Sequence, residues 1–221
     1  QIELRLLAHI SGDEAMQQAF LTGTDIHRST AARVYNMPEE MITPALRSSA
    51  KAVNFGIVYG ISAFSLSQDI GVSVAEAKDY IDSYLEKYSG VREYMKNIVE
   101  TAKEQGYVST LYNRRRALPE LNSSNFNTRS FGERVALNMP IQGTAADIMK
   151  LAMVNVYKRL KAEMPNAKLL LQVHDELICE CPEDEAEKVM QILEEEMNSA
   201  VQLSIPLTAE AKCGHSWAEA H

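Results

Sequence analysis

Apolar residues recur at helical spacing through roughly the first half of the chain. Leu4, Leu7 and Ala8 form the first such stripe and predict a short helix that begins near Glu3. Between positions 11 and 106, helix-capping residues and glycines follow one another at short intervals, so this region is expected to be a succession of short helices. The expected N-caps are Asp13, Thr24 or Asp25, Thr43, Ser62, and Ser73 in a capping box with Glu76.

The helix with the clearest ends runs from Thr43 to Gly60. Thr43 is a favourable N-cap, Pro44 suits the first helical position, and Gly60 can adopt the left-handed conformation just past the end. Later glycines and prolines bound the remaining predicted helices in the same way. Residues 107–111 and 117–118 flank Asn113 and a run of arginines, which predicts a small hairpin.

The second half of the chain mixes helical and strand patterns. A helix is expected from Asn127 or Thr128, interrupted at Pro140, with the apolar pattern resuming as far as Leu160. Three strands and one amphipathic helix are then predicted: a buried strand at 169–173, a returning strand at 177–181, a helix at 183–200 and a last strand at 206–212. The fold class is therefore α+β, with a helical subdomain preceding one that has a small antiparallel sheet backed by helices.

Composition adds limits rather than a function. The 221 residues are 46% hydrophobic and 24% charged, as in ordinary globular domains, and no apolar run approaches the roughly 20 residues that span a bilayer. Three cysteines make no disulfide framework, so a reducing, cytoplasmic setting is expected. The net charge of −8 confines any nucleic-acid contact to a local basic face.

One face of the helix at 43–60 carries candidate chemistry. Arg47, Lys51, Phe55 and Tyr59 recur every four residues and form a slowly winding stripe of two cations followed by two aromatic rings. Cations suit phosphates and rings suit a flat group, so a nucleoside triphosphate matches the stripe. Taken alone, the same spacing is more typical of a solvated face that grades into a core face.

A second candidate site lies between the two apolar strands. His174, Asp175 and Glu176 form the expected turn, where a strand pair would fix the direction of the carboxylates. Magnesium takes oxygen ligands, often one or two carboxylates together with substrate phosphates. A plain polar turn in water is the alternative interpretation of this tripeptide.

These stretches together resemble family A DNA polymerases, the bacterial DNA polymerase I group. The stripe helix is similar to the nucleotide-binding helix of the fingers, and Val173-His174-Asp175-Glu176 is similar to a turn that supplies one of two catalytic aspartates. Residues 1–5 resemble the end of the motif that supplies the other aspartate, whose Asp, Tyr and Ser would precede Gln1. The third match is Arg134-x3-Asn138-x3-Gln142.

The resemblance implies a role for each matching residue. His27, Arg47 and Lys51 would hold the triphosphate, with Lys51 also placed to protonate pyrophosphate, while Phe55 and Tyr59 would stack about the sugar and template base. Gln1 and Glu3 would complete the nucleotide site, and Glu3 would exclude a ribose 2′-hydroxyl. Asp175 would bind metal, with Glu176 in a supporting catalytic role. The primer–template contacts would be Arg134, Asn138, Gln142 and His174, although capping or helix-surface amides explain Asn138 equally well.

The resemblance also implies an organisation and partners. Residues 1–10 would be a palm remnant, 11–126 the fingers and 127–221 the palm. The expected function is template-directed deoxynucleotide transfer by a monomer, with two Mg2+ ions, primer–template DNA, deoxynucleoside triphosphates and no membrane. Two other functions stay open: a catalytically silent nucleotide- or DNA-binding fragment that lacks one metal-binding aspartate, and a metal-dependent nuclease. The intact fingers helix argues against the nuclease.

Cysteine spacing raises one question outside this resemblance. Cys179 and Cys181, like Cys213 and His215, are spaced to place both side chains on one face of a strand. If the two strands were neighbours, the four side chains could form a zinc site. We expect no such site, because a Cys-x-Cys pair in an apolar strand is commonly part of the core.

Overall fold

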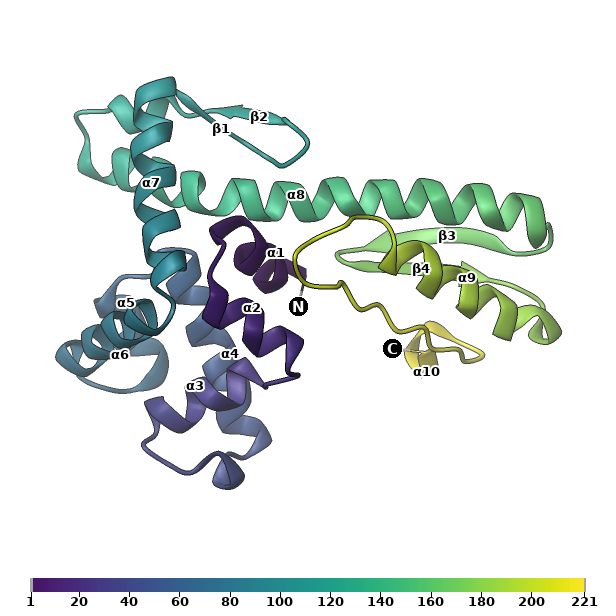
Figure 1. Ribbon diagram of the computed structural model, residues 1–221, viewed down its shortest axis with the longest axis horizontal. Coiled ribbons are helices and arrows are strands. Elements are labelled where there is room, and N and C mark those ends of the chain that lie inside the picture. The colour runs from purple at the N-terminus through teal and green to yellow at the C-terminus, as the bar shows by residue number, and fades with distance from the viewer. Residues whose placement is uncertain (1, 221) are drawn as a thin grey trace. The chain divides into compact units, whose positions relative to one another are not determined.

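The computed structural model describes residues 2–220, and its chain divides into two compact units (Figure 1). The helical unit comprises Leu7–Ile141. The mixed unit comprises the residues up to Leu6 together with those from Gln142 onwards. Among the described residues, no helix combines the length and apolar character needed to cross a bilayer.

The helical unit is a series of short helices followed by one small hairpin. Helix α1 (Ile2–Ser11) enters it from the mixed unit. The hairpin consists of β1 (Tyr107–Ser109) and β2 (Arg115–Ala117). The helices between them are α2 (Glu14–Leu21), α3 (Ile26–Val34), η1 (Glu39–Met41), α4 (Pro44–Val58), α5 (Ala63–Ile70), α6 (Val74–Lys87) and α7 (Ser89–Gln105).

The predicted caps define these helices. Thr43 accepts a hydrogen bond from the Leu46 N–H at the start of α4, and Gly60 beyond its end has a φ of +75°. Of the two candidate N-caps Thr24 and Asp25, Asp25 is the N-cap of α3. The capping predictions for α2, α5 and α6 are also confirmed, at Asp13, Ser62 and the Ser73–Glu76 capping box.

Asp13 also joins two helices that lie far apart in the sequence. One carboxylate oxygen accepts from the Met16 N–H at 2.8 Å, and the other accepts from the Gly90 N–H at 2.9 Å. The Val91 N–H donates to the same oxygen at 3.3 Å, so Asp13 satisfies first-turn donors of both α2 and α7. A Cβ at Gly90 would lie 2.9 Å from the Asp13 Cα, so only glycine permits this approach.

The predicted break at Pro140 is wrong. Helix α8 runs without interruption from Phe126 to Glu163 and includes the proline. A proline inside a helix costs about 3 kcal/mol, through one lost hydrogen bond and a steric clash. Leu137 and Ile141, on either side of Pro140, are both buried, and their packing offsets this cost. The η2 turn (Pro119–Asn122) precedes α8.

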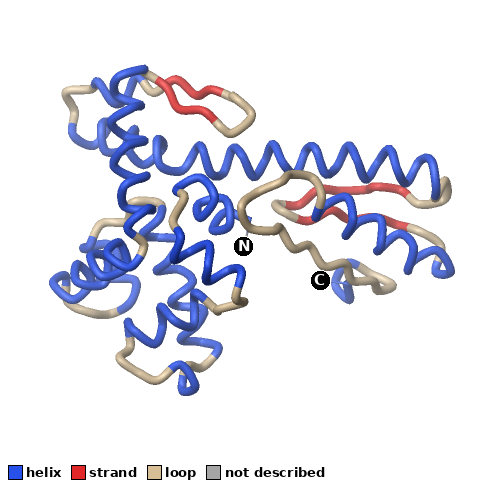
Figure 2. Tube along the Cα trace, viewed as in Figure 1, coloured by secondary structure: helices blue, strands red, loops and turns tan. Residues whose placement is uncertain are grey.

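The mixed unit contains a two-stranded antiparallel hairpin, the part of α8 from Gln142 onwards and a second helix, α9 (Ala186–Asn198), as Figure 2 shows. Strand β3 (Lys168–Val173) pairs with β4 (Glu176–Glu180), with a register shift between Leu169 and Leu171. Leu177 and Cys179 of β4, and Cys181 just after it, pack against buried residues of α8 and of α9. The short helix η3 (Glu183–Glu185) directly precedes α9. The buried members of this core are Val156, Leu160, Val189 and Ile192.

The prediction that residues 169–173 are buried is wrong. Leu170 is 49% exposed and Leu171 is 52% exposed. The core of the mixed unit is built on β4 side chains such as Leu177 and Cys179, and neither Leu170 nor Leu171 belongs to it. Apolar runs predict a strand but not how many of its faces are covered.

The predicted last strand, at 206–212, is absent from the described residues. Side chains of α9 bind its backbone in place of a neighbouring strand. The Ala209 N–H donates to Asn198 Oδ1 at 2.6 Å, and the Ala211 N–H donates to Glu194 Oε1 at 2.8 Å. A short helix, α10 (Trp217–Ala220), follows this segment.

Candidate active site

Helix α4 presents its cationic stripe to solvent and its other face to the core. Arg47 is partly exposed and Lys51 is exposed, whereas Ala50, Val53 and Ile57 are buried. Helix α3 packs alongside α4. The 3.6-residue period thus places the two cations one turn apart, with a packed helix behind them.

Asp25 holds the first of these cations. Its Oδ2 accepts a hydrogen bond from Arg47 Nε at 2.6 Å, and its Oδ1 accepts from the Arg28 N–H at 3.0 Å as the N-cap of α3. Partial burial raises the pKa of Asp25. The hydrogen bonds from Arg47 and Arg28, with the Arg47 charge, lower it by more, so the pKa lies below its ordinary value. The Asp25 carboxylate therefore stays charged and orients the guanidinium, whose remaining N–H groups can bind phosphate oxygens.

His27 lies on α3, behind the cationic stripe. It is only 5% exposed, and its Nδ1 lies 2.9 Å from Asn54 Nδ2 on α4. Burial, and then the charge of Arg47, lower the pKa of His27 below its ordinary value. A neutral imidazole is thus favoured at pH 7.

The aromatic rings follow the cations along α4. The Phe55 ring lies 6.1 Å from the His27 ring and 6.1 Å from the Tyr59 ring, with tilts of 35° and 36° respectively. Just beyond Tyr59, a Cβ at Gly60 would lie 3.1 Å from Leu137 and 3.7 Å from Arg134. Arg134 on α8 therefore lies beside the aromatic end of α4.

The acidic turn forms as expected between β3 and β4. His174 and Asp175 occupy the two turn positions and are both exposed, and Glu176 begins β4 half-buried. His174 has a φ of +51°, in the left-handed region where non-glycine residues are uncommon. Gln172 Nε2 donates to the His174 carbonyl at 3.1 Å and braces the turn.

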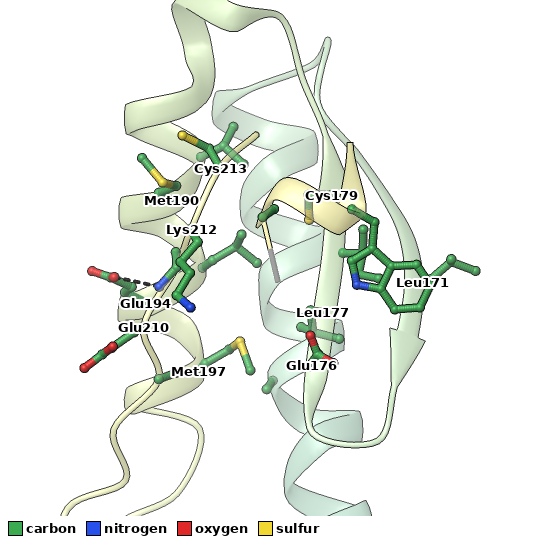
Figure 3. Close-up of a pocket in the computed structure, with 18 of the residues that line it drawn as sticks. Leu171, Glu176, Leu177, Cys179, Met190, Glu194, Met197, Glu210, Lys212 and Cys213 are labelled. Atoms are coloured by element: carbon green, nitrogen blue, oxygen red, sulfur yellow. Dashed lines mark hydrogen bonds between the residues drawn. The ribbon is translucent and has the colours of Figure 1, made fainter. Parts of the chain in front are cut away.

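Asp175 and Glu176 also line a hollow of about 1240 Å3 within the mixed unit. Figure 3 shows Glu176 and Leu177 on the β4 side, Met190 and Met197 on α9, and Cys213 on the C-terminal segment. Most of the surrounding side chains are apolar, and the carboxylates that line the hollow besides Asp175 and Glu176 are those of Glu180, Glu183, Glu194 and Glu210. Asp175 lies in the turn between β3 and β4, and Glu176 directly follows it.

The carboxylates of Asp175 and Glu176 fit the ligand chemistry of Mg2+. Magnesium commonly takes one or two protein carboxylates and completes its octahedron with waters and substrate phosphates. Asp175 and Glu176 supply such a pair, since both carboxylates flank the same turn. Within residues 2–220, no group of three or more His, Cys, Asp or Glu side chains is arranged to hold a metal.

The cysteine constellation does not gather into a metal centre in the described part of the chain. Cys179 packs against the core of the mixed unit, while Cys213 and His215 are exposed. Burial raises the pKa of the Cys179 thiol to about 11. A protonated thiol is a poor zinc ligand.

The predicted site residues fall into two sets. The helical unit contains His27, Arg47, Lys51, Phe55, Tyr59, Arg134 and Asn138. The mixed unit contains Glu3, Gln142, His174, Asp175 and Glu176. Glu3 is half-buried on α1, Gln142 is exposed on α8, and Gln1 lies outside the described residues.

Two residues of this site received no role from the sequence. Asp25 was considered only as a possible helix cap, yet it binds Arg47. Asn54 was one letter of a motif, yet it binds His27. A signal for Asn54 exists in the sequence, because a carboxamide between the apolar residues Val53 and Ile57 on a packed face needs a buried partner.

Comparison with known proteins decides the family. The model for "DNA polymerase family A" matches residues 1–219. The chain belongs to DNA polymerase family A. It is 51% identical to DNA polymerase I of Bacillus caldotenax over 220 residues and 52% identical to DNA polymerase I of Bacillus subtilis over 220 residues. In both comparisons all of this chain is covered, and it spans 25% of the relative's length.

A solved structure of this polymerase family has the same fold. The POL domain of Pol1 from M. smegmatis, in complex with DNA primer-template and dNTP, matches with a TM-score of 0.94 and 44% identity. The match covers all of this chain and 39% of that one. The predicted α+β class and the predicted family are thereby confirmed.

Proposed function

We propose that this chain is the fingers and part of the palm of a DNA polymerase that transfers deoxynucleotides to a primer 3′-hydroxyl as a template directs. The observation that carries the proposal is the α4 stripe, in which Arg47 and Lys51 precede Phe55 and Tyr59 beside a neutral, buried His27. Family membership and the primer–template and dNTP in the M. smegmatis complex support it.

In this proposal, the α4 stripe holds the incoming nucleotide. Arg47, oriented by Asp25, and Lys51 would bind the triphosphate, with His27 as a further donor. Lys51 would also supply the proton that pyrophosphate needs as it leaves. Phe55 and Tyr59 would pack against the sugar and the template base. Glu3 and Gln1 would complete the pocket on the sugar side.

The carboxylate turn would provide the metal-binding side of the reaction. Asp175 would hold Mg2+, and Glu176 would support it. When bound there, magnesium would supply activation of the attacking hydroxyl and charge neutralisation at the phosphates, and two ions are expected in the complete site. The left-handed backbone at His174 presents these acids at the hairpin tip.

The DNA contacts would come from a separate group of side chains. Arg134 lies beside the aromatic end of α4, where a new base pair would form. Arginine and amides can bind the minor-groove acceptors that every base pair presents, so they can read pair shape without reading sequence. The other members of this group are Asn138, Gln142 and His174. We further propose that the protein acts as a monomer in the cytoplasm, with 11–126 as fingers and 127–221, with the remnant at 1–10, as palm.

Primer extension by the full-length protein that contains this chain tests the proposal. With Mg2+ and all four deoxynucleotides, we expect the wild type to extend a primer and both Lys51→Ala and Asp175→Ala to lose most of this activity. Glu180→Ala is the matched control, because Glu180 is an exposed acid on the same hairpin. Near-normal extension by Lys51→Ala or Asp175→Ala would contradict the assignment.

A second candidate concerns this chain by itself: binding of nucleotide and DNA without catalysis. It is favoured by a donor set of only two adjacent carboxylates in the described residues. This chain alone would then bind a primer–template in a binding titration and would fail to extend it in the primer-extension assay. Extension that Asp175→Ala abolishes would instead show that the chain holds a complete catalytic site.

A further inference from the structure

The Asn54 side chain is buried in the packed face of α4 without full hydrogen bonding. It is 0% exposed, and its Oδ1 has no partner among the described residues. Its one polar contact is the 2.9 Å approach of Nδ2 to His27 Nδ1. An unsatisfied buried oxygen costs about 1–3 kcal/mol, so a purely structural asparagine would be a poor choice at this position.

The contact has a defined direction. A carboxamide nitrogen only donates, so His27 Nδ1 must accept and cannot carry a proton. The remaining ring nitrogen, Nε2, then carries the hydrogen of the neutral imidazole.

The surroundings of His27 agree with this neutral form. Burial and then the charge of Arg47 disfavour the imidazolium most, and Lys51 also disfavours it. Asp25 favours the imidazolium, but less strongly than Arg47 opposes it. The Phe55 ring lies 6.1 Å from the imidazole between centroids and is tilted by 35° to it. These are the charged and aromatic groups that face His27 from α3 and α4.

We propose that Asn54 is a positioning residue that fixes His27 as the Nε2–H tautomer, so that the ring offers a hydrogen-bond donor to a bound triphosphate. The triphosphate as the ligand rests on the proposed function, whereas the tautomer rests only on the contact between Asn54 and His27. In the opposite tautomer, Nε2 would present a lone pair to phosphate oxygens and repel them. Asn54 thus acts through His27, without touching the nucleotide itself.

Nuclear magnetic resonance of the chain tests the geometry directly and needs no nucleotide. The couplings between the ring protons and nitrogens distinguish the two neutral tautomers, and His27→Gln identifies the His27 signals among the five histidines. We expect the Nε2–H tautomer in the wild type. The Nδ1–H tautomer in the wild type would overturn the proposal.

Two substitutions extend the test. Asn54→Asp offers only acceptors, so the His27 proton is expected to move to Nδ1 and the pKa of the imidazole to rise. Asn54→Leu removes the donor without adding charge, and we expect the share of the Nε2–H tautomer to fall below its wild-type value, towards that of a free imidazole. An unchanged tautomer in both variants would contradict the role of Asn54.

Nucleotide titration supplies the functional readout. We expect Asn54→Leu to weaken binding of a deoxynucleoside triphosphate about tenfold, the effect of losing one hydrogen bond to a charged group. Ser67→Ala is the matched control, because Ser67 is a buried polar residue of the same unit that bonds to the Phe64 carbonyl instead. Equal losses in both variants would overturn the positioning role. If the wild type shows the expected tautomer but binds no nucleotide, the proposed function fails while the geometry stands.

Discussion

Arg47 is held through one nitrogen and offers the others. Its Nε donates to Asp25, and this bond fixes the orientation of the planar guanidinium. The two terminal nitrogens can then donate to a ligand. Lysine carries the same charge but lacks this planar fork. At the residue scale, the identity of the cation therefore matters as much as its charge.

We expect Arg47→Lys to weaken deoxynucleoside triphosphate binding by about tenfold despite conserving charge, because the bond to Asp25 and the planar donor set are both lost. Isothermal titration of the chain measures this change. Arg33→Lys, an exposed arginine on α3, is the control and should bind as the wild type does. Equal affinity of Arg47→Lys and the wild type would mean that Arg47 contributes charge alone.

His27 makes the folding stability depend on pH, in a direction that follows from its lowered pKa. As the pH falls, His27 of the unfolded chain takes up a proton near its ordinary pKa of 6.5, whereas in the folded protein it does so only at a lower pH. Stability from this residue is therefore complete above pH 6.5 and is lost as the pH falls towards the lower folded pKa. Asp25 has a lowered pKa as well, but it loses stability only below its ordinary value of 3.8.

We expect the urea midpoint of the wild type to fall between pH 7 and pH 5, and His27→Gln to show a shallower fall over the same range. Urea unfolding followed by circular dichroism measures both slopes. Parallel slopes would show that His27 does not titrate differently in the folded and unfolded states.

At the scale of the element, helix ends determine much of the helical unit. Asp13 is the clearest case, because one carboxylate satisfies donors at the start of both α2 and α7. The Ser73–Glu76 capping box, by contrast, serves α6 alone. The two caps therefore form a natural comparison.

Asp13→Ala should lower the free energy of unfolding by about 2 kcal/mol, because a buried cap that serves two helices is lost. Ser73→Ala should cost about 1 kcal/mol, as for an ordinary exposed cap. Thermal unfolding of the two variants compares them. A loss for Asp13→Ala no larger than for Ser73→Ala would show that the link to α7 adds no stability.

Sequence predicts these elements wherever the signal is local. The caps at Thr43 and Ser73 and the hairpin at Asn113 could be predicted because each depends on a few neighbouring residues. Pro140 was misread because burial of its neighbours outweighs a local penalty. The segment 206–212 was misread because its backbone donors bind distant side chains, Asn198 and Glu194, that no local pattern reveals.

At the scale of the whole molecule, the same limit applies to the candidate site. Motif spacing identified the residues that would meet the nucleotide, such as Lys51 and Phe55. It gave no role to Asp25, which binds Arg47, or to Asn54, which binds His27, because both contacts cross between α3 and α4. Arg47, Lys51 and Phe55 are spaced along the single helix α4, whereas Asp25 and Asn54 are found only through contacts between two helices.

The chain as a whole supplies two sets of candidate residues, one in each compact unit. Apart from Glu3 and Gln1, the nucleotide set lies in the helical unit, which has its own core clusters. Nucleotide binding can therefore be measured separately from metal-dependent chemistry at Asp175.

The most direct test of the α4 site is titration of this chain with a deoxynucleoside triphosphate in the presence of Mg2+. We expect saturable binding, weakened at least about tenfold by Lys51→Ala, since one charge-assisted contact is lost. Lys96→Ala, which removes an exposed lysine on α7 in the same unit, should bind as the wild type does. Binding that is equal in Lys51→Ala and the wild type would contradict a nucleotide site on α4.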